Sequence, residues 1–188
     1  MADSEPDEAL VRRVAVRDQR ALRILMERHM PRAMRVAQRV LNNVADSDDI
    51  GQEAFMRVWK HASSFDPAAA RFTTWFYRIV LNLAFDHARK PAHRPIEEAA
   101  EIPAACTAAV DRLIEQEQQA MLTDALSLLT DRQRAAIALF HMEGLSGKEA
   151  AQAMGLTEKA FESLLTRARI TLKQHVEQVE QGRRSFAS

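Results

Sequence analysis

The sequence predicts an all-α protein made of two small helical domains (a helical bundle and a helix-turn-helix) joined by a flexible linker. The chain has 188 residues, of which 47% are hydrophobic and 28% charged. Only five Gly and six Pro are present, which argues against a β-rich or low-complexity protein. Apolar residues recur at helical spacing on both sides of one proline-containing interruption. We therefore place the first domain at 1–91, the linker at 92–111 and the second domain at 112–188.

The composition indicates the cellular compartment in which the protein is expected. The single cysteine, Cys106, excludes an internal disulfide framework and fits a reducing compartment. The N-terminal residues MADSEPDEALVRRV are acidic where a signal peptide needs a basic segment and an apolar run. No stretch reaches the roughly 18 consecutive apolar residues of a membrane span. We expect a cytoplasmic protein without a membrane segment.

Charge is balanced overall but segregated along the chain. The formal net charge is zero, from 26 basic and 26 acidic residues, which argues against a protein that coats DNA through a globally basic surface. Residues 71–94 nevertheless hold five Arg or Lys against one acid, and residues 95–118 hold six acids against one Arg. A basic face followed by an acidic segment is expected.

The N-terminal elements are predicted to be three helices. Ser4 and Asp7 have the spacing of a capping box ahead of a short helix, and Asp18 is expected to cap a second helix. Pro31 stands where a third helix could begin, and Asn42-Asn43 marks the end of its apolar pattern. These helices carry too little apolar surface for a core of their own, so we expect them to pack on the segment that follows.

That segment, residues 46–89, predicts two amphipathic helices joined by a turn at Asp66-Pro67. It holds both Trp, the only Tyr and five of the eight Phe. The buried face of the first helix is expected to contain Ile50, Ala54, Phe55, Val58, Trp59 and Ala62. The buried face of the second is expected to contain Phe72, Trp75, Phe76, Ile79 and Leu83. The spacing of these residues matches the helical repeat, which predicts a packed helical hairpin.

A second face of the latter helix has a different chemistry. Arg78, Asn82, Phe85 and Arg89 fall together at helical spacing. Cations hold a nucleic-acid backbone, an amide can bind a base edge, and exposed rings can stack on unpaired bases. The set suits unpaired DNA better than a closed groove, and Asn82 with the loop Ala68-Ala69-Ala70 is the candidate base pocket. An ordinary hairpin with a mixed surface is the alternative.

The linker contains Pro95 and Pro103 and lacks a sustained period. Helical spacing then resumes toward residue 129, and Thr130 or Asp131 is expected to cap the next helix. Ser146 and Thr157 are predicted N-caps of a short helix and a longer one, separated by a turn with Gly155. This order is typical of a helix-turn-helix that reads DNA, although a structural helical hairpin has the same pattern.

The stretch DDIGQEAFMRVW, followed by FDP and RFTTWFYRIVLNLAFDHAR, resembles the second conserved region of bacterial sigma factors of the extracytoplasmic-function, or group IV, type. The resemblance implies that the first helix binds the clamp helices of the RNA polymerase beta-prime subunit. It also implies that the loop and second helix capture the non-template strand of the minus-ten element. The implied polymerase-binding residues are Asp49, Gln52, Glu53, Arg57 and Trp59. The implied minus-ten residues are Arg71, Thr74, Trp75, Tyr77, Arg78 and Asn82.

The stretch LTDRQRAAIALFHMEGLSGKEAAQAMGLTEKAFESLLTRARITLKQHV resembles the fourth sigma region, which reads the minus-thirty-five element. The implied contacts are Lys148, Thr157, Glu158, Lys159, Ser163, Arg167, Arg169 and Lys173. Ala160, Glu162 and Leu164 stand where the common family pattern has Thr, Lys and Arg. Two lost cations weaken phosphate attraction, and Glu162 repels phosphate unless it accepts from a cytosine amino group.

The resemblance implies a sigma factor that binds core RNA polymerase, through the beta-prime clamp helices and the beta flap, and opens promoter DNA. It also implies control by an anti-sigma factor, and a connector path through polymerase in which Glu97, Glu98 and Glu101 imitate nucleic-acid charge. Scattered His residues and the absence of a nucleophile signature predict no metal, no cofactor and no enzymatic activity. A helix-turn-helix regulator that binds duplex without polymerase, and a mimic that binds only an anti-sigma factor, remain alternatives.

Overall fold

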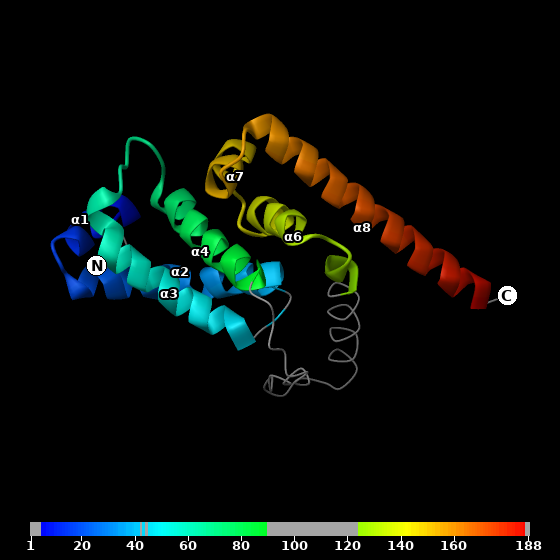
Figure 1. The fold of residues 1–188 in the computed structure, drawn as a ribbon, viewed down its shortest axis with the longest axis horizontal. Helices are drawn as coiled ribbons and strands as arrows, with labels where there is room; N and C mark the ends of the chain where they lie inside the picture. The colour runs from blue at the N-terminus through cyan, green and yellow to red at the C-terminus, as the bar shows by residue number, and fades with distance from the viewer. Residues whose placement is uncertain (1–4, 42, 44, 90–123, 187–188) are drawn as a thin grey trace.

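The computed structural model describes residues 5–41, 43, 45–89 and 124–186, and every regular element in these ranges is helical. The predicted all-α fold is confirmed, with the N-terminal and C-terminal helices forming two units (Figure 1). The first unit contains α1 (Asp7–Ala15), α2 (Gln19–Leu41), α3 (Ala45–His61), the 3-10 turn η2 (Ala62–Ser64) and α4 (Phe72–Arg89). The second contains α6 (Asp131–Ile137), the π-helical turn η3 (Ala138–Met142), α7 (Gly147–Met154) and α8 (Glu158–Phe186). The predicted linker, with Glu97, Glu98 and Glu101, lies outside the described residues.

The helix predicted to begin at Pro31 does not exist as a separate element. Helix α2 runs without a break from Gln19 to Leu41 with Pro31 inside it. An interior proline costs about 3 kcal/mol because it removes one backbone hydrogen bond and crowds the preceding turn. Buried residues of α2 lie on both sides of the proline, among them His29 and Ala33, and their packing holds both halves on one axis. The predicted helix end after Leu41 is confirmed.

The turn between α1 and α2 is fixed by side-chain caps. The Asp18 Oδ1 atom accepts hydrogen bonds from the backbone N–H groups of Arg20 at 2.8 Å and Ala21 at 3.3 Å, which confirms the predicted cap. The other predicted cap is only partly described, because Ser4 lies outside the described residues. Helix α1 begins after Pro6 without a side-chain cap bond.

Asp7 ties α1 to α2 instead of capping its own helix. Its carboxylate accepts from Arg28 at 2.8 Å and lies 2.7 Å from the His29 Nε2 atom. His29 is 7% exposed, and its ring lies edge-on to Phe72 at 5.2 Å between centroids. His29 is therefore a packed residue of the first unit. Burial raises the pKa of Asp7, but the hydrogen bonds from His29 and Arg28 outweigh it and leave the pKa below its ordinary value.

This contact predicts an acid-dependent loss of stability. A carboxylate whose pKa is lower in the folded state stabilises the fold above its unfolded pKa, and that stability is lost as pH falls through the folded value. We expect the free energy of unfolding to decline more steeply for the wild type than for Asp7→Asn between about pH 5 and pH 2. Urea titrations across this range measure the difference. Asp86→Asn, at an exposed carboxylate of α4, is the matched control, and equal slopes for the wild type and Asp7→Asn would contradict the prediction.

The aromatic concentration in residues 46–89 builds the core of the helical hairpin. The predicted turn is confirmed, because the Asp66 carboxylate accepts from the backbone N–H of Ala68 at 2.9 Å between α3 and α4. Phe76 lies 4.8 Å from Phe55 and 5.5 Å from Phe72 between ring centroids. Rings of this size bury large apolar areas, so a few of them can hold four helices of a small unit together.

Capping residues define the helices of the second unit as predicted. Thr130 forms a capping box with Gln133 at α6, and Ser146 forms another with Glu149 at α7. The Thr157 hydroxyl accepts from the backbone N–H of Ala160 at 3.2 Å at the start of α8. Satisfying these first-turn N–H groups fixes where each helix begins.

The two units pack against each other as one body. Helix α4 contacts α2 and α3 on one side and α7 on the other, while α2 also contacts α6. One apolar cluster includes residues of both units, and the fully buried residues of α7 in it are small side chains that allow close helix approach. These small residues are Ala150, Ala151 and Ala153. Helix α8 runs alongside this body and its C-terminal half extends beyond it (Figure 1). None of the described helices is long and apolar enough to cross a membrane.

Candidate nucleic-acid interface

Helix α3 presents a polar surface away from the core. Asp49 and Gln52 are exposed, and Glu53 is half-buried and pairs with Arg57 at 3.1 Å. Met56 lies on this helix with 52% of its surface exposed. A surface with acids, an amide and one apolar side chain suits protein contact better than phosphate contact, because carboxylates repel phosphate.

Trp59, on the same helix, contacts the turn between α1 and α2. The Arg17 guanidinium lies 5.2 Å from the centre of its indole ring and donates a hydrogen bond to the Trp59 carbonyl at 3.0 Å. Arg17 occupies the left-handed backbone region, with φ 70°. The tryptophan and arginine together hold the α1–α2 turn against α3.

The predicted minus-ten residues separate into exposed and buried groups. Arg71, Arg78 and Asn82 are exposed on or beside α4. Thr74 is buried, and its hydroxyl has no hydrogen-bond partner within the described part of the chain. Trp75 is half-buried with its ring 5.2 Å from that of Phe65. In this arrangement, only the first group is available to a strand of DNA.

Tyr77 lies between the two units. Its hydroxyl donates to the Glu143 carboxylate at 2.5 Å, and its side chain is 2% exposed. Burial, reinforced by the hydrogen bond and the negative charge of Glu143, raises the pKa of Tyr77 well above its ordinary value. The phenol therefore stays protonated and acts as a donor. Sequence patterns gave no signal for this contact, because Tyr77 and Glu143 come from distant segments.

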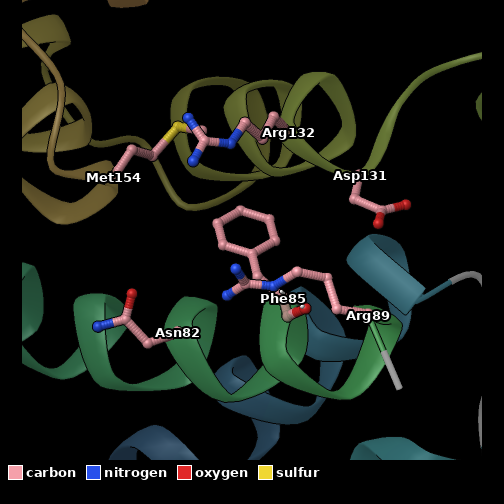
Figure 2. A pocket seen from close by; sticks show the side chains of 6 residues that line it. All are labelled: Asn82, Phe85, Arg89, Asp131, Arg132 and Met154. Carbon is pink, nitrogen blue, oxygen red and sulfur yellow. Dashed lines mark hydrogen bonds between the residues drawn. The ribbon is translucent and has the colours of Figure 1, made fainter. Parts of the chain in front are cut away.

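A cleft of about 220 Å³ opens where α4 faces the second unit. Figure 2 shows Asn82 and Phe85 of α4 directed toward the second unit, where Arg132 and Met154 lie, while the Arg89 side chain runs back along α4. The Arg132 guanidinium lies 5.9 Å from the centre of the Phe85 ring. The structure thus brings Asn82, Phe85 and Arg89 of the predicted set together without Arg78, and it adds three residues that sequence analysis did not place at this site, Asp131, Arg132 and Met154.

The candidate base pocket is only partly assembled. Asn82 lines the cleft, but none of the three residues of the loop Ala68-Ala69-Ala70 does. The Ala69 carbonyl instead accepts a hydrogen bond from Gln152 of α7 at 3.0 Å. The expected grouping of this loop with Asn82 is therefore not seen in the present arrangement, because α7 lies against the loop.

The start of α8 forms a second exposed polar surface. Thr157, Glu158, Lys159 and Ser163 are exposed there, and Lys148 is exposed at the start of α7. Ala160 and Glu162 are also exposed, whereas Leu164 is partly buried against the apolar cluster. Leu164 therefore contributes to packing, which accounts for an apolar residue where the family pattern has a cation.

Cations continue along the same helix. Arg167 and Lys173 are exposed, and Lys173 pairs with Glu177 at 3.7 Å. Arg169 approaches His141 at 3.0 Å and the Phe140 ring at 5.4 Å. His141 was not among the predicted residues, since a lone His carries no pattern. Within the described residues, no group of three His, Cys, Asp or Glu side chains could hold a metal ion.

Two family models match the chain. Sigma-70 region 2 matches residues 25–94, and Sigma-70, region 4 matches residues 119–172. The first model spans α3 and α4, including the exposed polar surface of α3 and the cleft residues of α4. The second spans α6 and α7 and the start of α8. The two candidate surfaces therefore fall in two different conserved regions of the family.

Curated relatives agree with these matches. RNA polymerase sigma factor NccH of Alcaligenes xylosoxydans xylosoxydans is 34% identical over 182 residues, covering 92% of this chain and 95% of that protein. The ECF RNA polymerase sigma factor SigK of Mycobacterium bovis is 28% identical, covering 88% of this chain and 91% of that protein. The probable RNA polymerase sigma factor RfaY of Xanthomonas campestris pv. campestris is 31% identical over 73% of this chain, a match that spans 36% of that longer protein.

A solved structure shares the arrangement of helices. It is the structure of CnrH in complex with the cytosolic domain of CnrY, with a TM-score of 0.71 and 28% identity, covering 93% of this chain and 99% of that chain. The family models, the identity to NccH over nearly the full length of both proteins, and the shared fold agree. The chain belongs to the sigma-70 family, as a sigma factor of the extracytoplasmic-function type.

Proposed function

We propose that this sigma factor binds core RNA polymerase, directs it to promoters and helps to open the DNA, without making or breaking a bond itself. The observation that carries the proposal is that one chain of this family has two separate polar surfaces. These are the α4 face with Asn82 and the start of α8. Two DNA-binding surfaces on one chain can bind two DNA sites at once, so their affinities combine. The proposed place of action is the cytoplasm.

The polymerase contact is proposed for α3. Its exposed face carries Asp49, Gln52 and the Glu53–Arg57 pair, and the main contacts of α3 within the described residues are with elements of its own unit. The proposed partner is the pair of beta-prime clamp helices, with the second unit binding the beta flap. Trp59 contributes to this site by holding the helix in place, as its contact with Arg17 indicates.

The minus-ten contact is proposed for α4 and the loop before it. Arg71 and Arg78 would neutralise phosphate, and Asn82 would bind a base that has left the duplex. Thr74, Trp75 and Tyr77 belong to the same proposed segment, although the core or the second unit covers them here. The minus-thirty-five contact is proposed for Lys148, Thr157, Glu158, Lys159, Ser163, Arg167, Arg169 and Lys173.

An anti-sigma factor is the proposed regulator. The CnrH structure, which this chain resembles at 28% identity, was solved with the cytosolic domain of CnrY. Exposed apolar side chains are present in both units here, with Met56 at 52% and Met142 at 45% exposure. Flexible methionines suit the apolar face of a partner helix.

Reconstituted transcription tests the proposed function. Purified protein is combined with bacterial core RNA polymerase and a genomic promoter library, and the transcripts are sequenced from their 5′ ends. Discrete start sites that depend on both components are expected. Core polymerase alone provides the background, and a transcript set identical with and without this protein would reject the proposal. Duplex binding without any effect on polymerase would instead support an ordinary helix-turn-helix regulator.

The exposed Glu162 gives a test of the α8 surface. Replacing it by Lys is expected to strengthen nonspecific duplex binding and to steepen the slope of log affinity against log salt by about one, because one more phosphate is neutralised. Fluorescence anisotropy with a random duplex at several salt concentrations measures both changes. Glu27→Lys, at an exposed position of α2, is the matched control. Equal slopes for the two variants would place Glu162 away from DNA.

A further inference from the structure

The Arg169 side chain of α8 is held by a neighbouring element. Its Nε and Nη2 atoms lie 3.2 Å and 3.0 Å from the Nε2 atom of His141, which belongs to the π-helical turn η3. The guanidinium carbon lies 5.4 Å from the centre of the Phe140 ring. Arg169 and His141 are both exposed. We refer to Phe140 and His141 together as the guanidinium support.

The hydrogen bonds define the state of the His141 ring. An arginine side chain only donates, so the Nε2 atom must accept, which needs the neutral ring with its proton on Nδ1. Two of the five guanidinium N–H groups point to His141, and three remain for another acceptor. Among the residues that the structure describes, no carboxylate forms an ion pair with Arg169. The positive charge is therefore available to an anion outside the chain.

The guanidinium support rests on the core of the second unit. The Phe140 ring lies 5.1 Å from the His141 ring and 6.4 Å from the fully buried Phe161 ring, measured between centroids. The turn closes with a hydrogen bond from the Glu143 N–H to the Ala138 carbonyl at 3.0 Å. A π-helical turn adds one residue, which rotates the side chains after it by about 100° relative to a continuous α-helix. The wide turn thus decides which side chains of η3 face α8.

The held arginine lies on the proposed minus-thirty-five helix. Arg169 is on the same side of α8 as Glu162, two helical turns further along. Glu162 and Leu164 stand where the family pattern has cations, so a phosphate contact further along the helix carries more weight. Arg167 donates to the Ser163 carbonyl of its own helix at 3.2 Å. Arg169 differs because a second element orients it.

We propose that His141 is a positioning residue for DNA binding: with Phe140 it fixes the Arg169 guanidinium beside α8, where the three remaining N–H groups bind a phosphate of duplex DNA. The inference rests on the proposed function, since it adds a support to the proposed minus-thirty-five surface. Ordering a free side chain on binding reduces affinity, and a side chain that is already held avoids part of this cost. His141 thus raises affinity without touching the DNA.

Nuclear magnetic resonance of the full chain tests the contact without DNA. Isotope-labelled arginine gives an Nε–Hε signal for each arginine, and the Arg169 signal is the one missing from Arg169→Lys. We expect His141→Ala to shift this signal and to speed the exchange of its proton with water. The Arg167 signal should stay unchanged, because its bond to Ser163 lies within α8. An Arg169 signal that is identical in the wild type and His141→Ala would overturn the proposal.

Fluorescence anisotropy with a random-sequence duplex at several salt concentrations measures the effect on binding. We expect His141→Ala to bind about 2- to 10-fold more weakly than the wild type, with an unchanged slope of log affinity against log salt because the phosphate contact remains. Arg169→Ala should lower that slope by about one. His141→Gln, whose amide oxygen accepts in place of Nε2, should bind within about twofold of the wild type. His61→Ala, at an exposed histidine of α3, is the matched control.

A double variant separates positioning from direct contact. In the Arg169→Ala background, His141→Ala should change affinity by less than about 1.5-fold, since no guanidinium is left to position. A full His141 effect in this background would mean that His141 binds DNA itself. Wild-type affinity of the single His141→Ala variant would mean that Arg169 needs no support, and a loss in His141→Gln equal to that in His141→Ala would mean that the acceptor is irrelevant. Each of these three results overturns the proposal.

Transcription with core polymerase is measured separately with the same proteins. If none of them gives a core-dependent transcript, the proposed function fails. The resonance and duplex measurements do not depend on polymerase, so they still decide whether His141 positions Arg169.

Discussion

Replacing Asn82 by Ala is expected to reduce promoter opening by about 10- to 100-fold while leaving polymerase binding unchanged. Asn82 is exposed on α4 beside Phe85 and Arg89 (Figure 2), where its amide can bind the edge of an unpaired base. A base contact of this kind contributes about 1–3 kcal/mol. Permanganate reactivity of promoter thymines measures opening, and native gel titration with core polymerase measures assembly.

Two comparisons make the Asn82 result specific. Gln52→Ala, on the exposed face of α3, is expected to show the reverse pattern, with weaker assembly and normal opening in the complexes that form. The free energy of unfolding of Asn82→Ala is expected to stay within about 0.5 kcal/mol of the wild type, because the residue is a surface one. An equal loss of polymerase binding and of promoter opening in Asn82→Ala would contradict the proposed role of Asn82.

Replacing Arg134 by Ala is expected to destabilise the protein by about 2–4 kcal/mol, through lost hydrogen bonds and an internal void. Arg134 is 8% exposed, and its guanidinium donates to the carbonyls of Val40 at 2.9 Å and Leu129 at 2.6 Å. Burial lowers the pKa of Arg134, while the nearby Asp131 opposes the shift. Removing the side chain leaves buried carbonyl groups without hydrogen-bond donors. This loss accounts for the larger part of the expected destabilisation.

Thermal unfolding measures the effect of Arg134→Ala. At about 2–4 °C per kcal/mol for a chain of this size, the midpoint should fall by roughly 10 °C. Arg132→Ala, two residues away and exposed, is the matched control and should change stability by less than about 1 kcal/mol. Because Val40 lies in the last turn of α2 in the first unit, the Arg134 variant should also lengthen the distance between the units. An unchanged midpoint would mean that the packing around Arg134 does not depend on its hydrogen bonds.

Sequence reasoning worked where local interactions decide the structure. The caps at Asp18, Ser146 and Thr157 and the turn at Asp66 are made within a few residues, so the residue types alone predicted them. Reasoning from local patterns failed at Pro31, where α2 continues because packing of its two halves outweighs a local backbone cost. The grouping of Asn82, Phe85 and Arg89 followed from helical spacing, and Figure 2 shows them on one face.

The sequence by itself determined the all-α class, the helical hairpin, the helix starts and the family, because each depends on local period, caps or motifs. Only the tertiary structure decided which surfaces are free. It brings the Glu143 carboxylate to the Tyr77 hydroxyl and the Glu149 carboxylate to Arg71. It also brings the Arg134 guanidinium to the last turn of α2. These contacts join segments more than 60 residues apart, and no periodic pattern encodes such pairs. Their geometry depends on how two packed units fit together, which the whole chain decides.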